Sequence, residues 1–176
     1  MWHILILLEF SVARHETHTS GLRGSGHLVK AQPYGEGRRA GAIIANKRLG
    51  IRHMDLFSQG RAFGGVFSWG GWKVRAIGGH ADAGGDRRPY QKSIDDIEFI
   101  VDCTPHDHIV ILGVDTQTPL GPQTMHDNPN LIGEFVMGDR GWKGERVMRM
   151  LGHFDFHLPH TFVQGFDKKY TGTNNG

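Results

Sequence analysis

The chain has 176 residues, of which 38% are hydrophobic and 22% charged, which is typical of one globular domain and excludes a disordered chain. Its formal net charge of +2 neither requires nor excludes a nucleic-acid partner. The single cysteine, Cys103, excludes an internal disulfide and indicates a reducing compartment. The apolar N-terminal stretch is too short to span a bilayer and has no basic start, so we expect an intracellular protein, nuclear or cytoplasmic, without a membrane partner.

The first part of the chain is rich in patterns that predict β-strands. Residues 4–8 form a continuous apolar run, which is typical of a central strand buried on both faces. Residues 19–26 are rich in Gly and Ser and predict a loop. Further strands are expected at residues 41–45, 54–57, 63–68 and 72–77.

Helices alternate with strands in the second part of the chain. Ser93 and Asp96 form a capping-box pattern, and the isoleucines around them lie at helical spacing, so a helix is expected to begin at Ser93. Residues 109–112 predict another buried central strand. The remaining elements are expected to be a loop at 118–133, a helix at 144–151 and a strand at 154–158. This order indicates an α/β (α+β) fold, a layered β-sandwich flanked by helices.

Two carboxylates follow the two most apolar strands, where ligand sites of such folds gather. Glu16 comes after the run at residues 4–8, and Asp115 after the run at 109–112. Mg²⁺ prefers carboxylate oxygens and needs only one or two of them, and a second carboxylate can orient an attacking water. The alternative is that each acid is simply a solvated loop residue.

Four segments resemble, in order, the motifs of the endonuclease/exonuclease/phosphatase superfamily. Residues 15–18 (HETH) are similar to its Gln-Glu-Thr-His segment, and residues 112–118 to its Gly-Asp-Phe-Asn segment. Residues 132–146 and 160–162 resemble the glycine-containing run and the Asn-Thr-Phe segment that follow. Order and spacing match the versions that accompany the reverse transcriptases of non-LTR retroelements. The resemblance covers nearly the whole chain and implies a DNase-I-like fold.

The resemblance implies a role for each matching position. Glu16 would be the ligand of Mg²⁺ (or Mn²⁺), and Asp115 would orient or deprotonate the attacking water. Gln117 stands where the family has an Asn that helps to hold the phosphate. His80 stands where the family has a Tyr or His near the scissile phosphate.

Three further residues are candidates for substrate binding. His18 is expected either to line the cleft or to cap its loop. Arg87 and Arg88 form a basic pair on a predicted loop. They are expected either to contact phosphate groups of a substrate or to be solvated surface residues.

The sequence also departs from the family pattern. His15 replaces a Gln, Gln117 replaces an Asn and carries one more methylene, and Asp82 stands where the family often has Pro. The family's first strand, and its C-terminal strands with an Asp and a Ser-Asp-His segment, have no counterpart. We therefore expect residues 1–176 to form a single, incomplete domain of this type.

The function expected from these observations is metal-dependent hydrolysis of phosphodiester bonds in nucleic acid, DNA rather than RNA, with activity that is weak or lost. One alternative is a non-catalytic remnant of a retroelement endonuclease, which keeps the fold and binds nucleic acid weakly. Another is a phosphatase that acts on small phosphoesters. The sequence leaves the oligomeric state open.

Overall fold

The computed structural model describes residues 4–11, 18–21, 27–33, 39–51, 53–134, 136 and 138–162. The chain divides into two compact units, Met1–Asp115 and Thr116–Gly176. The first unit holds two β-sheets and the helix α1 (Arg87–Asp102), and the second holds the helix α2 (Trp142–His153). None of the helices in the described part of the chain combines the length and the hydrophobicity that a membrane span requires.

The first sheet is antiparallel, with the strand order β1-β4-β3-β2. Its strands are β1 (Ile4–Ser11), β2 (His18–Gly21), β3 (His27–Pro33) and β4 (Arg39–Asn46). The apolar run at residues 4–8 is a strand, as predicted, but it lies at one edge of this order and not in the centre. The predicted loop at 19–26 is wrong in its first part, because β2 occupies those residues and pairs with β3.

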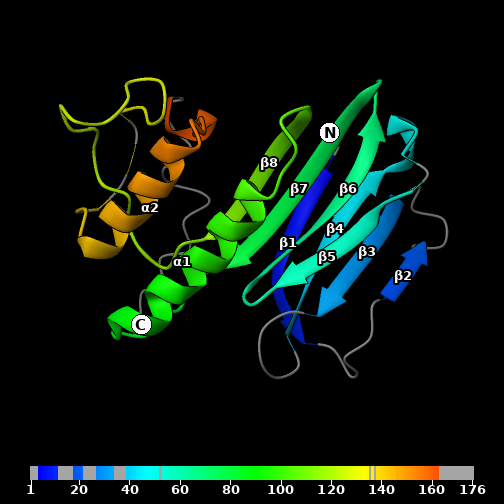
Figure 1. Ribbon diagram of the computed structural model, residues 1–176, viewed down its shortest axis with the longest axis horizontal. Helices are drawn as coiled ribbons and strands as arrows, with labels where there is room; N and C mark the ends of the chain where they lie inside the picture. The colour runs from blue at the N-terminus through cyan, green and yellow to red at the C-terminus, as the bar shows by residue number, and fades with distance from the viewer. Residues whose placement is uncertain are drawn as a thin grey trace. The chain divides into compact units, whose positions relative to one another are not determined.

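The second sheet is mixed, with the order β5-β6-β7-β8 (Figure 1). Its strands are β5 (Asp55–Gln59), β6 (Ala62–Trp69), β7 (Trp72–His80) and β8 (His108–Asp115). The first three pair in antiparallel fashion, and β7 pairs with β8 in parallel. The tight turn between β6 and β7 is made by Gly70 and Gly71, which both have positive φ, as a two-residue hairpin turn requires.

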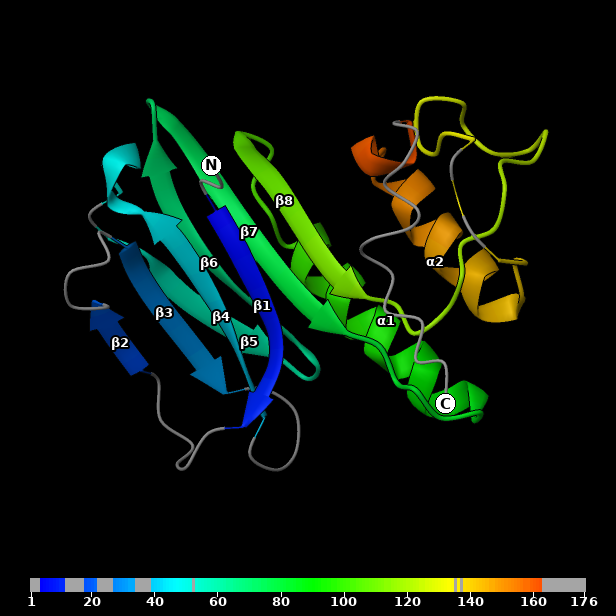
Figure 2. The ribbon, with the colours of Figure 1, turned by 180° about the vertical axis from the view of Figure 1, so that it is seen from behind.

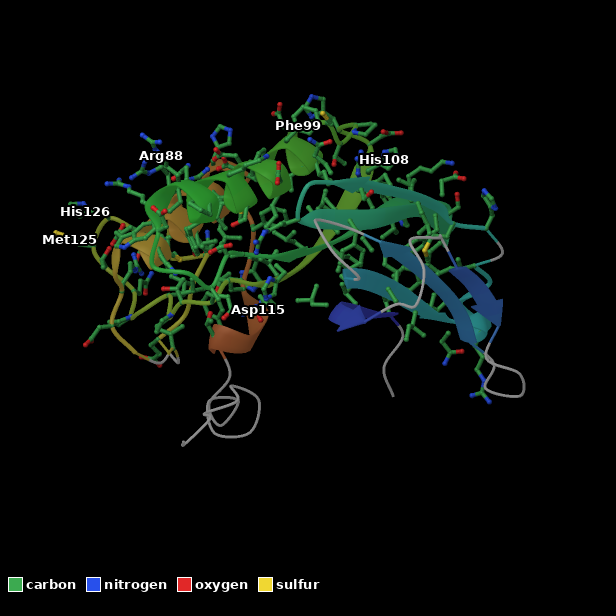
Figure 3. The ribbon with its side chains drawn as sticks, turned by 90° about the horizontal axis from the view of Figure 1, so that it is seen from below. Arg88, Phe99, His108, Asp115, Met125 and His126 are labelled. Atoms are coloured by element: carbon green, nitrogen blue, oxygen red, sulfur yellow. The ribbon has the colours of Figure 1, made fainter. Side chains whose placement is uncertain are left out.

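The helix α1 connects β7 to β8, because parallel neighbours need a long crossover connection. It covers the face of the second sheet that is turned away from the first sheet (Figures 2 and 3). The helix begins at Arg87 with Asp86 as its N-cap, so the prediction of a capping box at Ser93 is wrong. Ser93 is buried inside the helix, where its Oγ donates to the Tyr90 carbonyl (2.7 Å) and accepts from the Asp82 backbone N–H (3.1 Å).

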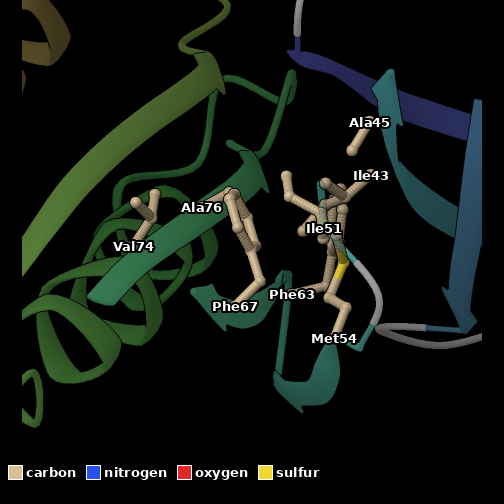
Figure 4. Packing of buried hydrophobic residues seen from close by; sticks show 8 residues of the cluster. All are labelled: Ile43, Ala45, Ile51, Met54, Phe63, Phe67, Val74 and Ala76. Atoms are coloured by element: carbon tan, nitrogen blue, oxygen red, sulfur yellow. The ribbon is translucent and has the colours of Figure 1, made fainter. Parts of the chain in front are cut away.

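The core of the first unit lies between the two sheets. Its buried cluster consists of Ile43, Ala45, Ile51, Met54, Phe63, Phe67, Val74 and Ala76 (Figure 4). Phe63 is 1% exposed, and its ring fills space that Gly41 and Gly78 leave. A Cβ would come within 2.0 Å of the ring at Gly41 and within 2.3 Å at Gly78. The close approach of the sheets therefore depends on this Phe and these two glycines together.

We predict that Phe63→Ala lowers the free energy of unfolding by about 3–5 kcal/mol, because it removes a buried aromatic ring and leaves a cavity. The matched control is Phe99→Ala, since Phe99 lies on α1 with 57% of its surface exposed and should change stability by less than about 1 kcal/mol. Urea unfolding of both variants measures the difference. Equal losses in the two variants would contradict the assignment of the core.

The second unit contains α2, a 3-10 turn η2 (Pro159–Phe162) and a long loop before the helix. The helix confirms the one predicted at 144–151. The strand predicted at 154–158 is wrong, because the chain turns back after the helix at Asp155, which has a φ of 52°. The Phe156 N–H then bonds to the Leu151 carbonyl (2.9 Å), and the Leu158 N–H to the Leu131 carbonyl (2.9 Å). The backbone of this segment therefore bonds to helix and loop instead of a sheet.

Arg140 holds the long loop of the second unit together. Only 6% of its side chain is exposed, and it donates to both carboxylate oxygens of Asp127 at 2.9 and 2.8 Å. The same guanidinium donates to the carbonyl oxygens of Leu120 and Pro122. The hydrogen bonds from Arg140 lower the pKa of the Asp127 carboxyl. A buried cation with so many partners is typical of a structural anchor.

The Asp127–Arg140 pair should make stability depend on pH. A carboxyl whose pKa is lowered by folding stabilises the fold above its unfolded-state pKa of about 3.9, and this contribution is lost as the pH falls through the lower folded-state value. We predict that Asp127→Asn lowers the free energy of unfolding by about 1.5–3 kcal/mol at pH 7, and by much less near pH 3. Urea unfolding at both pH values, with Asp139→Asn as the exposed control, measures this. A loss that is equal at both pH values would contradict it.

Candidate functional site

The parallel strands β7 and β8 end side by side. Their register places His80, the last residue of β7, opposite Asp115, the last residue of β8. His80 Nε2 lies 3.8 Å from Asp115 Oδ2, within range of an ion pair but beyond a hydrogen bond. Figure 3 shows Asp115 and His108 at the two ends of β8. Since ligand sites of α/β folds form at the carboxyl ends of parallel strands, this pair is the candidate site.

The side chains of the pair lie on the sheet face that packs against β1. Residues two apart in a strand share a face, so His80 shares its face with Gly78, and Asp115 with Gly113. A Cβ at Gly78 would come within 2.9 Å of Ile6 Cγ2, and a Cβ at Gly113 within 3.3 Å of Ile6 Cδ1. The β1 residue Ile6 therefore packs over both strands two positions before the site.

The two members of the pair differ in exposure. Only 8% of the His80 side chain is exposed, compared with 45% of the Asp115 side chain. Packing restricts the buried imidazole to a defined orientation, whereas the carboxylate can contact water and a substrate. A carboxylate in this position can take a proton from water, and an imidazole can donate a hydrogen bond to an oxygen anion. The sequence pointed to both residues, and the structure brings them together.

The structure also brings to His80 two residues to which the sequence assigned no role in the site. Arg61 Nη2 lies 2.7 Å from Asp82 Oδ2, and both side chains are partly buried. The Arg61 carbonyl accepts a hydrogen bond from the His80 backbone N–H (3.2 Å). The sequence signal was Asp82 in place of a family Pro, but nothing in the sequence indicated its partner 21 positions earlier.

Arg87 and Arg88 occupy the first turn of α1, where a loop was predicted. Both side chains are exposed, and Arg88 projects outward from the helix (Figure 3). The backbone N–H groups at a helix N-terminus favour anions, so two cations in the first turn gain nothing from the helix dipole. Their exposure leaves them accessible to phosphate groups.

Gln117 belongs to the second unit and follows β8 by two positions. It is exposed and has a φ of 50°. Asn adopts this left-handed conformation far more readily than Gln does. The replacement of the family Asn thus changes the backbone preference of this position as well as the length of its side chain.

The residues predicted from the region after β1 are only partly described. Glu16 and His15 lie outside the described residues. His18 is the first residue of β2, opposite Ala31 of β3, at the other edge of the first sheet from β1. It is β1 that contacts β7 and β8.

A metal would need oxygen ligands here. Within the described ranges, no three His, Cys, Asp or Glu side chains gather closely enough to bind a metal ion. The exposed carboxylate of Asp115 is nevertheless the donor type that Mg²⁺ takes, and one or two such groups suffice when waters complete the shell. The chemistry of this end of the sheet is therefore compatible with a nearby divalent cation.

Comparison with protein-family models gives no match, and comparison with curated protein sequences gives none either. Comparison with solved structures does give matches. The structure of D. rerio TDP2 complexed with single strand DNA product matches at a TM-score of 0.50 with 14% identity, over 66% of this chain and 48% of that chain.

Two further structures are similar at lower scores. The endonuclease domain of TRAS1, a telomere-specific non-LTR retrotransposon, matches at a TM-score of 0.48 with 15% identity, over 86% of this chain and 58% of that chain. Truncated Caenorhabditis elegans TDP2 matches at 0.43 with 19% identity, over 66% and 49%.

The chain spans about half the length of the solved structures that it matches. The likeness to D. rerio TDP2, together with the two packed sheets and α1, confirms the predicted fold class, a layered α/β sandwich. At this level of identity the likeness concerns the fold and not the activity.

Proposed function

We propose that the chain is a metal-dependent phosphodiesterase that acts on nucleic acid, in a single domain of the DNase-I-like type. The observation that carries the proposal is the meeting of His80 and Asp115 at the ends of two parallel strands, 3.8 Å apart. DNA is the first substrate to test, because the structure of D. rerio TDP2 holds a single strand DNA product.

In this proposal Asp115 orients the attacking water and accepts its proton, since its carboxylate is exposed. His80 donates a hydrogen bond to a phosphate oxygen, whose negative charge grows as the water attacks. The buried position of His80 keeps its imidazole oriented before substrate arrives. This division of roles uses a solvent-accessible base and a fixed donor.

The remaining predicted residues would bind the metal and the substrate. Mg²⁺ or Mn²⁺, with Glu16 as its ligand, would offset the charge of the phosphate. Gln117 would contact the same phosphate. Contacts with the nucleic acid outside the cleaved phosphate are proposed for His18, Arg87 and Arg88.

We predict that the chain nicks supercoiled plasmid DNA in Mg²⁺ and that Asp115→Asn or His80→Gln lowers the rate by about 10²-fold or more, as loss of a general base or a charge-stabilising donor does. Glu16→Ala should lower the rate to a similar extent. Agarose-gel assays over a series of enzyme concentrations measure the rate. The matched control is Asp107→Asn, because Asp107 is exposed and precedes β8, at the end of the strand away from the site.

The alternatives give different results in the same preparation. Binding of labelled DNA without any cutting, unchanged by Asp115→Asn, would favour a non-catalytic remnant. Release of inorganic phosphate from small esters, lost in Asp115→Asn and without plasmid nicking, would favour a phosphatase. Equal nicking by the parent and Asp115→Asn would mean that the activity comes from a contaminant, and the proposal would fail.

A further inference from the structure

We propose that Arg61 and Asp82 are positioning residues for His80, and that their ion pair ties the end of β7 to the turn between β5 and β6 and so holds the imidazole beside Asp115. This inference rests on the proposed function for its role in catalysis. The structural part of the inference, that the ion pair fixes His80 relative to Asp115, depends only on contacts within the first unit and not on the proposed function.

Arg61 is fixed from two sides. It lies in the turn between β5 and β6, directly before β6 begins at Ala62, and Ala62 pairs with Gly79. Its carbonyl accepts the His80 backbone N–H at 3.2 Å, and its own backbone N–H donates to Asp96 Oδ2 at 3.3 Å. Asp96 is a buried residue of α1. The backbone of Arg61 therefore links the helix to His80.

Gly60 makes this approach of the turn to the helix possible. Its φ is +51°, a conformation that glycine adopts without strain. A Cβ at this position would come within 1.9 Å of Asp96 Oδ2. The turn can thus lie against the carboxylate of Asp96 only because it has no side chain there.

Asp82 is fixed as firmly on the other side of His80. Its backbone N–H donates to Ser93 Oγ of α1 at 3.1 Å, and its Oδ1 accepts from the Gly84 N–H at 2.8 Å. Its Oδ2 lies 2.7 Å from Arg61 Nη2. Side chains with 17% and 34% exposure form an ion pair that is shielded more than a surface pair.

These contacts enclose a short length of chain. Asp82 is two residues after His80, and between them the Ala81 N–H donates to the Asp115 carbonyl at 2.9 Å. Movement of this segment away from β8 would have to break that bond and the ion pair together. Two buried polar residues of α1 thus hold both members of the ion pair. Ser93 binds the backbone N–H of Asp82, and Asp96 binds the backbone N–H of Arg61.

The test measures amide hydrogen exchange of the complete chain by NMR. We expect Arg61→Met and Asp82→Ala to speed exchange of the Ala81 N–H about tenfold, the factor that corresponds to loss of an interaction of roughly 1.4 kcal/mol. The mid-strand Val74 amide should stay within twofold of its parent rate. Arg61→Lys should recover part of the protection. The control is Asp55→Ala, which removes an exposed ion pair with His53 at the same 2.7 Å distance.

A second measurement separates positioning from general stability. Asp115→Asn should shift the imidazole NMR signals of His80, and in an Arg61→Met background this shift should shrink at least twofold, because His80 is no longer held beside residue 115. Arg61→Met leaves the two backbone-linked hydrogen bonds of Asp82 in place, so it keeps the test possible if Asp82→Ala does not fold. Unchanged Ala81 exchange and an undiminished His80 shift in Arg61→Met would overturn the proposal.

The nicking assay distinguishes failure of the positioning role from failure of the proposed function. If the parent cuts DNA, Arg61→Met should lower kcat with little change in KM, and a change in KM alone would count against a positioning role. If the parent does not cut, the proposed function fails, and the exchange and imidazole measurements still decide whether Arg61 and Asp82 hold His80.

Discussion

The parallel pairing of β7 with β8 is the constraint on which the rest of the candidate site depends. Two antiparallel neighbours run in opposite directions, so their C-terminal ends would lie far apart. Because β7 and β8 run in the same direction, their last residues, His80 and Asp115, lie side by side. A slip of one residue in the register would turn one of the two side chains to the other face. The long crossover that parallel pairing requires is α1, so the same choice also supplies the helix that covers the sheet.

The helix contributes more than cover, because two of its buried residues are polar. Ser93 and Asp96 would destabilise an apolar helix face if their side chains had no partners. Here Ser93 accepts from the backbone of Asp82, and Asp96 accepts from the backbone of Arg61. The desolvation of these two groups is offset by hydrogen bonds that fix the segments on either side of the strand end. The outer face of the sheet is therefore coupled to the His80–Asp115 pair on its inner face.

Sequence patterns identified the strand-forming runs, the second helix and the position of Asp115, because these depend on local hydrophobicity and on the resemblance to a family. They failed where the outcome depends on distant partners. The apolar runs of β1 and β8 were expected in sheet centres, yet both are at an edge of the described strand orders, and Ile109 is 44% exposed. Ser93 has the pattern of an N-cap, but its hydroxyl bonds within and beyond the helix. The Arg61–Asp82 pair joins positions with no shared local signal.

Gln117 shows why a motif match and a site are different things. A φ of 50° lies in the left-handed region, which costs a residue other than glycine about 1 kcal/mol and which Asn adopts more readily than Gln does. The residue at this position therefore combines a longer side chain with a less favourable backbone preference than the Asn of the motif has. The pair formed by His80 and Asp115 needs no such compromise, since strand geometry sets both residues. The strand-end pair is therefore the part of the candidate site that the fold itself fixes, whereas Gln117 is the part that departs from the motif.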